Sequence, residues 1–237
     1  FGSSHLGPRE HRQAPLRAAW KMKVVLIGDS NVGKSALVHR FIYNKLLAES
    51  KATVGIAFFK QTLRDDETGE EFAMQIWDTA GQEKFQSVTT HHYRAADGGL
   101  LVFDLASERS FSNVDKWLAE LRENTDPNVV VALVGTKADL RDRREVPLER
   151  AQAYAKDNGL IYMETSSYWD KQQGSVQDTV AGVQRVFLRM LRAIVHQQRK
   201  GGGGRSTRLD ISGYGENGRG QVRLGADRGP RQGECGC

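Results

Sequence analysis

The chain has 237 residues, of which 39% are hydrophobic and 27% are charged. This length and composition are typical of one globular domain with additional chain. No run approaches the ~18 apolar residues that a membrane-spanning helix needs, so an integral membrane protein is not expected. The two cysteines, Cys235 and Cys237, both lie among the last three residues. The body therefore offers no disulfide or cysteine-ligated zinc site, and we expect an intracellular, reducing compartment.

The formal net charge of +5 is concentrated at the two ends of the chain. Residues 1–20 carry +2 and residues 199–237 carry +4, which leaves −1 for residues 21–198. A near-neutral body is a poor surface for a nucleic acid, so no nucleic-acid partner is expected. Residues 1–20 are predicted to be a flexible leader, cut or tagged, because they lack the apolar core of a secretory signal. Twelve of the 25 glycines follow Lys200, which predicts a disordered Gly/Arg-rich tail over 199–237.

Between these ends, short β-branched runs alternate with segments of helical period. The predicted strands cover residues 24–27, 58–63, 72–77, 100–104, 129–134 and 161–163. Apolar residues at helical spacing predict helices around 37–42, 117–121 and 183–194. This alternation predicts an α/β fold with a mostly parallel six-stranded sheet and helices on both faces. Strands 58–63 and 72–77, joined by a polar turn, should form its antiparallel edge.

A glycine-rich motif directly follows the first predicted strand. It reads Gly28-Asp29-Ser30-Asn31-Val32-Gly33-Lys34-Ser35, which matches G-x-x-x-x-G-K-[ST]. In such a loop, backbone N–H groups surround phosphate oxygens, Lys34 reaches the outer phosphates and Ser35 ligates Mg²⁺. The alternative is a chance glycine turn, expected in roughly one chain in a hundred of this size. The strand before it and the helix after it favour a phosphate loop.

A second motif, Trp77-Asp78-Thr79-Ala80-Gly81-Gln82-Glu83, begins where another predicted strand ends. Carboxyl ends of parallel strands meet at one sheet edge, so Asp78 can hold Mg²⁺ opposite the phosphate loop. Gly81 can bring its backbone N–H to a terminal phosphate, and Gln82 can orient a water with its amide. Taken alone, this motif would be an acidic surface turn. Beside a phosphate loop, a catalytic role for Gln82 and Lys34 is favoured.

A third motif, Thr136-Lys137-Ala138-Asp139, follows the strand over residues 129–134. The two acceptor oxygens of the Asp139 carboxylate match the adjacent N–H and NH₂ donors of guanine. Adenine presents an acceptor there and would leave a desolvated carboxylate unpaired. The alternative is an exposed Lys and Asp in a solvated turn, but the position in the fold favours guanine recognition.

Together, these motifs resemble the Ras-like small GTPases and, within them, the Rab branch that governs vesicle traffic. The resemblance covers roughly residues 22–197. It implies that Thr53 contacts Mg²⁺ and the γ-phosphate, and that the loop Glu164-Thr165-Ser166-Ser167 lies against the guanine carbonyl. The runs 53–58 and 163–165 are most similar to the early-endosome Rab group.

The chain departs from the family pattern mainly near the expected base site. Thr136 replaces the usual Asn, and Leu46 stands where the family usually places an aromatic ring against the guanine. Ser167 replaces Ala, and roughly three extra residues occur around 168–173. His92 is the third member of the aromatic triad, with Phe58 and Trp77, that the resemblance assigns to effector binding. The expected base site therefore comprises Leu46, Thr136, Lys137, Asp139, Ser166 and Ser167.

The chain ends in Cys235-Gly236-Cys237, which is similar to the C-x-C ending of Rab proteins. By that resemblance both cysteines carry geranylgeranyl chains, and two lipids give stable anchoring. Inert thiols or a strained local disulfide are the alternatives. The resemblance implies a monomer on the cytoplasmic face of an intracellular membrane, with a soluble pool in the cytosol. The similarity to the early-endosome Rab group points to the early endosome as that membrane. Its expected partners are an exchange factor, a GTPase-activating protein, a dissociation inhibitor or escort protein, and effectors.

The sequence thus predicts a membrane-tethered switch that binds GTP or GDP with Mg²⁺ and hydrolyses GTP slowly. No arginine lies between Arg40 and Arg64, so the segment around Thr53 has no arginine finger of its own and a partner must supply one. Two other hypotheses stay open at this point. One is a P-loop ATPase or nucleotide kinase, and the other is a catalytically silent binding module.

Overall fold

The computed structural model describes residues 19–47, 53, 55–81, 92–168, 176–200 and 208–209. Its strands are β1 (Ala19–Ile27), β2 (Ile56–Arg64), β3 (Glu71–Thr79), β4 (Gly98–Asp104), β5 (Val130–Thr136), β6 (Ile161–Glu164) and β7 (Arg208–Leu209). Its helices are α1 (Lys34–Tyr43), α3 (Glu108–Ser112), α4 (Val114–Asn124), α5 (Leu148–Asp157) and α6 (Val176–Lys200). A short 3-10 helix covers Arg141–Arg143.

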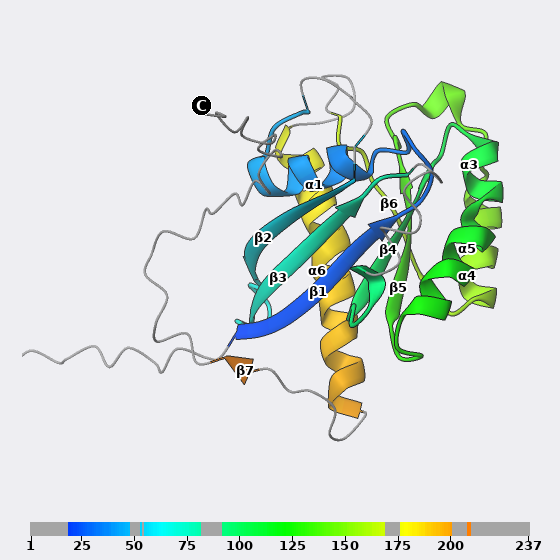
Figure 1. Cartoon of the computed structure of the whole chain (residues 1–237). Coiled ribbons are helices and arrows are strands. Elements are labelled where there is room, and N and C mark those ends of the chain that lie inside the picture. Colours follow the sequence, from blue (N-terminus) through cyan, green and yellow to red (C-terminus); the bar gives the residue numbers. More distant parts are fainter. Residues whose placement is uncertain are drawn as a thin grey trace, which may run out of the picture.

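These strands form one sheet in the order β2-β3-β1-β4-β5-β6 (Figure 1). The β2–β3 pair is antiparallel, and each other pair along this order is parallel. The predicted α/β fold, with a mostly parallel six-stranded sheet and one antiparallel edge, is confirmed. In addition, β7 pairs antiparallel with the start of β1.

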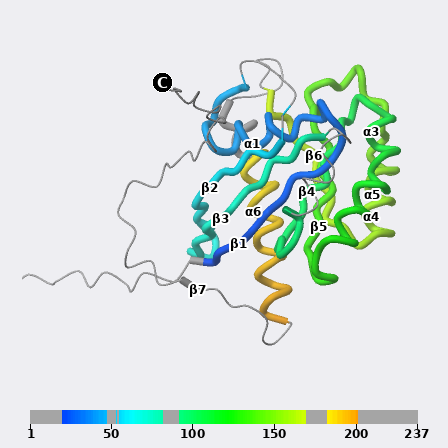
Figure 2. Tube along the Cα trace, viewed as in Figure 1, coloured from blue at the N-terminus to red at the C-terminus, as the bar shows by residue number. Residues whose placement is uncertain are grey.

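Helices cover both faces of this sheet, as Figures 1 and 2 show. On one face, α1 and α6 pack on a buried cluster that includes Val24 and Leu26 of β1. On the other, α4 and α5 pack on a second cluster that includes Val25 and Ile27. Successive side chains of a strand point to opposite faces, so the uninterrupted apolar run of β1 supplies both layers. The continuous apolar strands that the sequence shows are therefore explained by burial on both sides.

Several element bounds differ from the prediction. The first strand begins at Ala19, inside the predicted leader, because Trp20 is buried and pairs with Phe72 of β3. Helix α5 has no counterpart among the predicted helices, since its buried residues are only Ala151 and Ala155. Helix α3 is only five residues long. Helix α6 reaches Lys200, and β7 lies within the predicted tail.

Ion pairs join α6 to the turn between β2 and β3. Arg192 donates two 2.6 Å hydrogen bonds to the fully buried Asp65, and it lies 3.0 Å from Glu67. Arg199 also pairs with Glu70. In the β2–β3 register, Ile56 pairs with Thr79 at one end and Arg64 pairs with Glu71 at the other. These ion pairs therefore lie at the sheet edge opposite to the carboxyl end of β3.

Candidate functional site: a nucleotide pocket at the carboxyl edge of the sheet

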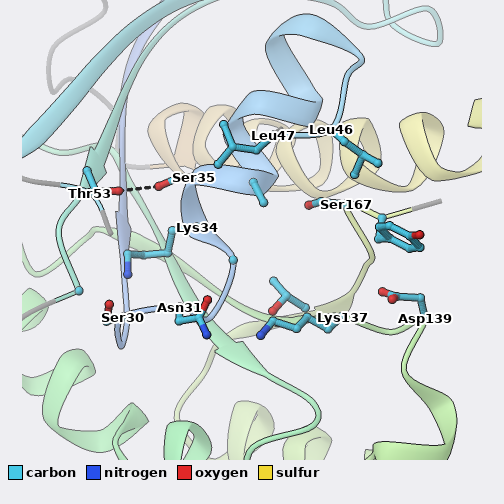
Figure 3. Close-up of a pocket in the computed structure, with 15 residues that line it drawn as sticks. Ser30, Asn31, Lys34, Ser35, Leu46, Leu47, Thr53, Lys137, Asp139 and Ser167 are labelled. Atoms are coloured by element: carbon cyan, nitrogen blue, oxygen red, sulfur yellow. Dashed lines mark hydrogen bonds between the residues drawn. The ribbon is translucent and has the colours of Figure 1, made fainter. Parts of the chain in front are cut away.

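A cavity of about 520 Å³ opens where β1, β3, β5 and β6 end, a volume typical of small-molecule sites. Figure 3 shows Lys34, Ser35 and Thr53 at one end of this cavity and Leu46, Ser167 and Asp139 at the other. We call these the phosphate end and the base end. The full lining is Ser30, Asn31, Gly33, Lys34, Ser35, Ala36, Leu46, Leu47, Thr53, Gly81, Thr136, Lys137, Asp139, Ser167 and Tyr168.

The loop over residues 28–33 connects β1 to α1 and cannot be built without glycine. Gly28 has φ 138°, and a Cβ there would lie 2.1 Å from the carbonyl oxygen of Val102. The carboxylate of Asp29 accepts 2.7 Å hydrogen bonds from Asn113 Nδ2 and Trp117 Nε1. This side chain therefore holds the loop against α4, and only the backbone of Asp29 is left to serve a ligand in the cavity.

Lys34 lies across the same loop. Its buried Nζ donates to the carbonyl oxygens of Gly28 at 2.8 Å and of Asp29 at 2.7 Å. Burial lowers the pKa of Lys34 to about 8, against the opposing charges of Asp78 and Asp29. An ammonium has three N–H donors, and these two carbonyls account for two of them. The side chain thus both fixes the loop and brings a cation to its centre.

The oxygens of Ser35, Thr53 and Asp78 meet at the phosphate end. Ser35 Oγ donates to Asp78 Oδ2 at 2.6 Å and lies 2.7 Å from Thr53 Oγ1 (Figure 3). Asp78 is buried, and this burial raises its pKa to about 6, although the Ser35 hydrogen bond and the Lys34 charge lower it. Its Oδ1 has no hydrogen-bond partner among the described residues. A buried carboxylate oxygen in this position needs a partner.

These oxygen donors fit Mg²⁺, which binds one or two carboxylates and keeps oxygen ligands from water or phosphate. Within the described ranges, no group of three or more His, Cys, Asp or Glu side chains forms a metal site. The candidate donor set therefore combines the Asp78 carboxylate with the hydroxyls of Ser35 and Thr53. Gly81 completes this end, because a Cβ there would lie 2.4 Å from the carbonyl carbon of Asp29 and from Ser30 N.

At the base end, Asp139 and Lys137 line the cavity and are tied to neighbouring loops. Ser166 Oγ donates to the Asp139 carboxylate. Lys137 Nζ forms a 2.7 Å ion pair with Asp104. Thr136 is buried, and its hydroxyl contacts the carbonyl oxygens of Val32 and of Phe103, the latter at 2.9 Å. The predicted base residue Thr136 thus joins the phosphate loop to the end of β4.

Two residues at the base end were not predicted from the sequence. Leu47 and Tyr168 line the cavity beside the predicted Leu46 and Ser167. The only signal for Tyr168 was its place at the start of the extra residues relative to the family spacing. Arg40, which is buried on α1, donates from Nε to Ser167 O at 2.8 Å and from Nη1 to Asn44 O at 3.1 Å. It therefore connects the loop after β6 with the end of α1.

The three rings of the predicted effector surface form one row. The ring centroids of Phe58 and Trp77 are 4.8 Å apart, and those of Trp77 and His92 are also 4.8 Å apart. Lys23 Nζ lies 5.1 Å from the Trp77 ring, and Lys60 Nζ lies 5.9 Å from the Phe58 ring. The predicted triad is thus contiguous, and ammonium groups flank it.

Other predicted residues lie outside the described ranges. These are the catalytic Gln82, the lipidation sites Cys235 and Cys237, and the extra residues from 169 to 173. Within the described helices, none combines the length and apolar character needed to cross a membrane.

The fold and the site together define a class of protein. A phosphate loop after β1, a hydroxyl and carboxylate cluster for Mg²⁺, and an aspartate at the far end of the same cavity are the features of a small G domain. The profile of the Ras family matches residues 23–194, and the chain belongs to this family. It is 49% identical over 161 residues to the Ras-related protein RABA1b of Arabidopsis thaliana, a match that covers 68% of this chain and 72% of that protein. The chain is a Rab-type small GTPase, in the branch associated with vesicle trafficking.

Proposed function

We propose that this GTPase is a membrane-tethered switch that hydrolyses GTP slowly and recruits effectors in its GTP state. One observation carries the proposal. Ser35 and Thr53 line the phosphate end of a cavity whose base end contains Asp139, and Ser35 donates to the buried Asp78, whose Oδ1 has no hydrogen-bond partner among the described residues. Such a cavity accommodates a nucleotide along its length, with the charged groups placed for phosphates at one end and for a base at the other.

At the phosphate end, backbone N–H groups of residues 28–33 and of Gly81 are placed to bind phosphate oxygens. The positively charged ammonium group of Lys34 would bind the outer phosphates. Ser35, Thr53 and Asp78 would hold Mg²⁺, which supplies positive charge to the β- and γ-phosphates when bound. Because Thr53 and Gly81 reach the cavity from segments outside the phosphate loop, their positions depend on whether a γ-phosphate is present.

Hydrolysis is assigned to a water that Gln82 orients toward the γ-phosphorus. The water oxygen bonds the γ-phosphorus as the bond from that phosphorus to the bridging oxygen breaks, which yields GDP, inorganic phosphate and a proton released to solvent. Lys34 offsets charge on the transferring group. The segment between Arg40 and Arg64 contains no arginine, so we expect slow intrinsic turnover and a GTPase-activating protein that supplies one.

The surface near Thr53 and Gly81, whose positions are proposed to depend on GTP, is suited to binding partner proteins. The row consists of Phe58 on β2, Trp77 on β3 and His92, and the ammonium groups of Lys23 and Lys60 favour carboxylates on an effector. Cys235 and Cys237 are proposed to carry geranylgeranyl chains. The remaining proposed partners are an exchange factor and a dissociation inhibitor or escort protein. The proposed location is the cytoplasmic face of an intracellular membrane, namely the early endosome, with a soluble cytosolic pool of monomer.

Nucleotide competition tests the switch. Protein loaded with labelled GDP is mixed with equal concentrations of unlabelled GTP or ATP, at fixed Mg²⁺. Label should be displaced by GTP and retained with ATP. Displacement by ATP would instead support an ATPase or nucleotide kinase.

A turnover assay tests the proposed catalytic role of Gln82. Gln82→Leu should bind GTP normally and hydrolyse it poorly when an activating protein is present, because only the water-orienting amide is lost. Gln152→Leu, on the exposed surface of α5, is the matched control. Equal turnover in Gln82→Leu and the parent would contradict the assigned role. A silent binding module would show no turnover in the parent at all.

Sedimentation tests the membrane anchor. In a lysate that contains the prenylating enzymes, the parent should sediment with membranes and the Cys235→Ser, Cys237→Ser double variant should stay in the supernatant. A variant in which tail arginines are replaced by glutamine should still sediment, because dispersed charges are screened at physiological salt. Membrane binding by the double cysteine variant would contradict the anchor.

A further inference from the structure

Tyr168 presents an aromatic ring at the base end of the cavity. The residue is 56% exposed, the highest value among the large hydrophobic residues that the structure describes. It lines the cavity together with Leu46, Asp139 and Ser167. No ring of another described residue packs against it. The ring therefore has apolar surface that a ligand in the cavity can cover.

Hydrogen bonds of residues 166–168 hold the backbone that leads into Tyr168. The N–H of Tyr168 donates to Ser166 Oγ at 3.0 Å, and the same hydroxyl bonds the Asp139 carboxylate. In addition, Nε of the buried Arg40 donates to Ser167 O at 2.8 Å. The backbone at Tyr168 is thus fixed relative to the carboxylate that the proposed function assigns to the edge of the base. An exposed ring on a fixed turn is suited to binding a ligand.

A base whose edge bonds Asp139 still has two flat faces to remove from water. Leu46 lines the cavity at this end, but an aliphatic side chain lacks the stacking interaction of a ring. Among the described residues that line the base end, Tyr168 is the aromatic one, and it comes from the loop after β6. Because Tyr168 follows β6, its ring lines the cavity near the Asp139 carboxylate. Leu46, in contrast, comes from the segment after α1.

We propose that the Tyr168 ring packs against the guanine base of the bound nucleotide and supplies the aromatic contact that Leu46 cannot. This inference rests on the proposed function, because it requires guanine nucleotide in this cavity. The contact comes from the ring, so the phenol hydroxyl is dispensable. Tyr168 then sets how long the protein retains GDP, without a role in the chemical step.

Dissociation of labelled GDP from the full chain, at several Mg²⁺ concentrations, tests this role. Tyr168→Ala should release GDP roughly 2- to 13-fold faster than the parent, the range for an aromatic contact. Tyr168→Phe should release GDP at the parental rate. Tyr43→Ala is the control, because Tyr43 is 39% exposed, packs on His39 and does not line the cavity. It should also keep the parental rate.

Two further readouts separate base packing from a structural role of the loop. The Mg²⁺ concentration that gives half-maximal retention of GDP should be the same in Tyr168→Ala and the parent, because the phosphate end is untouched. Leu46→Phe added to Tyr168→Ala should recover part of the lost retention, since it returns a ring to the base end. The inference would be overturned if Tyr168→Ala released GDP at the parental rate, or if Tyr168→Phe released it as fast as Tyr168→Ala. In either case GDP binding itself would stand. A parent that retains no GDP would overturn the proposed function as well.

Discussion

The phosphate end and the base end of the cavity differ in how their side chains are held. At the phosphate end, Lys34 and Asp78 are buried, Lys34 donates to the Gly28 carbonyl oxygen, and Asp78 accepts from Ser35. At the base end, Leu46 is 44% exposed and Tyr168 is 56% exposed. The first arrangement is assembled from segments next to strand ends, whereas the second depends on two loops. Lys34 and Asp78 at the phosphate end are therefore held by burial beside strand ends, whereas the exposed Leu46 and Tyr168 at the base end are where this chain can vary how tightly it retains a nucleotide.

The largest expected effect is at the phosphate end. Asp78→Asn keeps the size of the side chain but removes the charge that faces Ser35 and Thr53. The Mg²⁺ concentration needed to retain GTP should rise by more than ~10- to 100-fold. That range is typical of losing a residue that only hydrogen-bonds a metal ligand, whereas Asp78 is proposed to contact the metal itself. Titration of Mg²⁺ against release of labelled GTP measures this shift. Asp115→Asn on α4, where the carboxylate accepts from Tyr154 of α5, should leave the titration unchanged. An unchanged curve for Asp78→Asn would remove the proposed metal site.

The next effect sharpens the contrast at the base end. Asp139→Asn turns one acceptor into a donor that opposes the donors of guanine. GTP affinity should fall by roughly 10- to 150-fold, as for hydrogen bonds to a charged group, while affinity for xanthosine triphosphate rises. Equilibrium competition with the two nucleotides measures both changes. Asp142→Asn, exposed on the neighbouring 3-10 helix, serves as the control. Parental GTP affinity in Asp139→Asn would contradict the guanine assignment.

The two ends also differ in how far the sequence predicted them. The phosphate loop and Asp78 follow strands whose apolar runs are readable, and parallel strands bring such residues to one edge. The bonds from Asp29 to Asn113 and Trp117 were not predictable, because they join residues more than 80 positions apart in the chain. Tyr168 was not assigned to the cavity because its place depends on the path of the loop after β6. Local pattern and the family resemblance therefore located residues at both ends, Asp139 and Leu46 at the base end included, whereas tertiary packing decided the contacts of Asp29 and the place of Tyr168.

The same limit applies to the fold. The long apolar strands and α6 were readable, but α5 buries only Ala151 and Ala155 and so lacks a strong helical pattern. The first strand reaches Ala19 because the β3 partner of Trp20 is Phe72, a pairing that local composition does not encode. The roles of Gln82 and of the tail cysteines stay predictions.

A substitution away from both ends separates loss of stability from loss of binding. The hydrogen bonds from Arg192 lower the pKa of Asp65 to about 2, although burial opposes this shift. An unfolded aspartate has a pKa of ~3.9, so the ionised Asp65 stabilises the fold above that pH. This contribution is lost as the pH falls from ~4 toward 2. Urea unfolding should show that Asp65→Asn is less stable at pH 7 and less sensitive to acid over that interval.

GDP release from Asp65→Asn at pH 7 should match the parent, because the β2–β3 turn lies at the opposite edge of the sheet. Faster GDP release from Asp65→Asn would mean that a loss of stability alone speeds release. The release rates of variants at the cavity would then have to be corrected for their free energies of unfolding. An acid dependence equal to that of the parent would show that Arg192 does not set the ionisation of Asp65.

The smallest expected effect tests the base end from the side of Leu46. Leu46→Phe adds a ring at a half-exposed position of the cavity lining, where little packing must be displaced. A ring against the base is worth about 0.5 to 1.5 kcal/mol beyond its area, so GDP release should slow by roughly 2- to 13-fold. Dissociation of a fluorescent GDP analogue at fixed Mg²⁺ measures it. Leu148→Phe, at a leucine of similar exposure on α5, controls for added apolar surface. If Leu46→Phe and the parent release GDP at the same rate, position 46 does not touch the base, and the contrast between the two ends rests on Tyr168 and Asp139 alone.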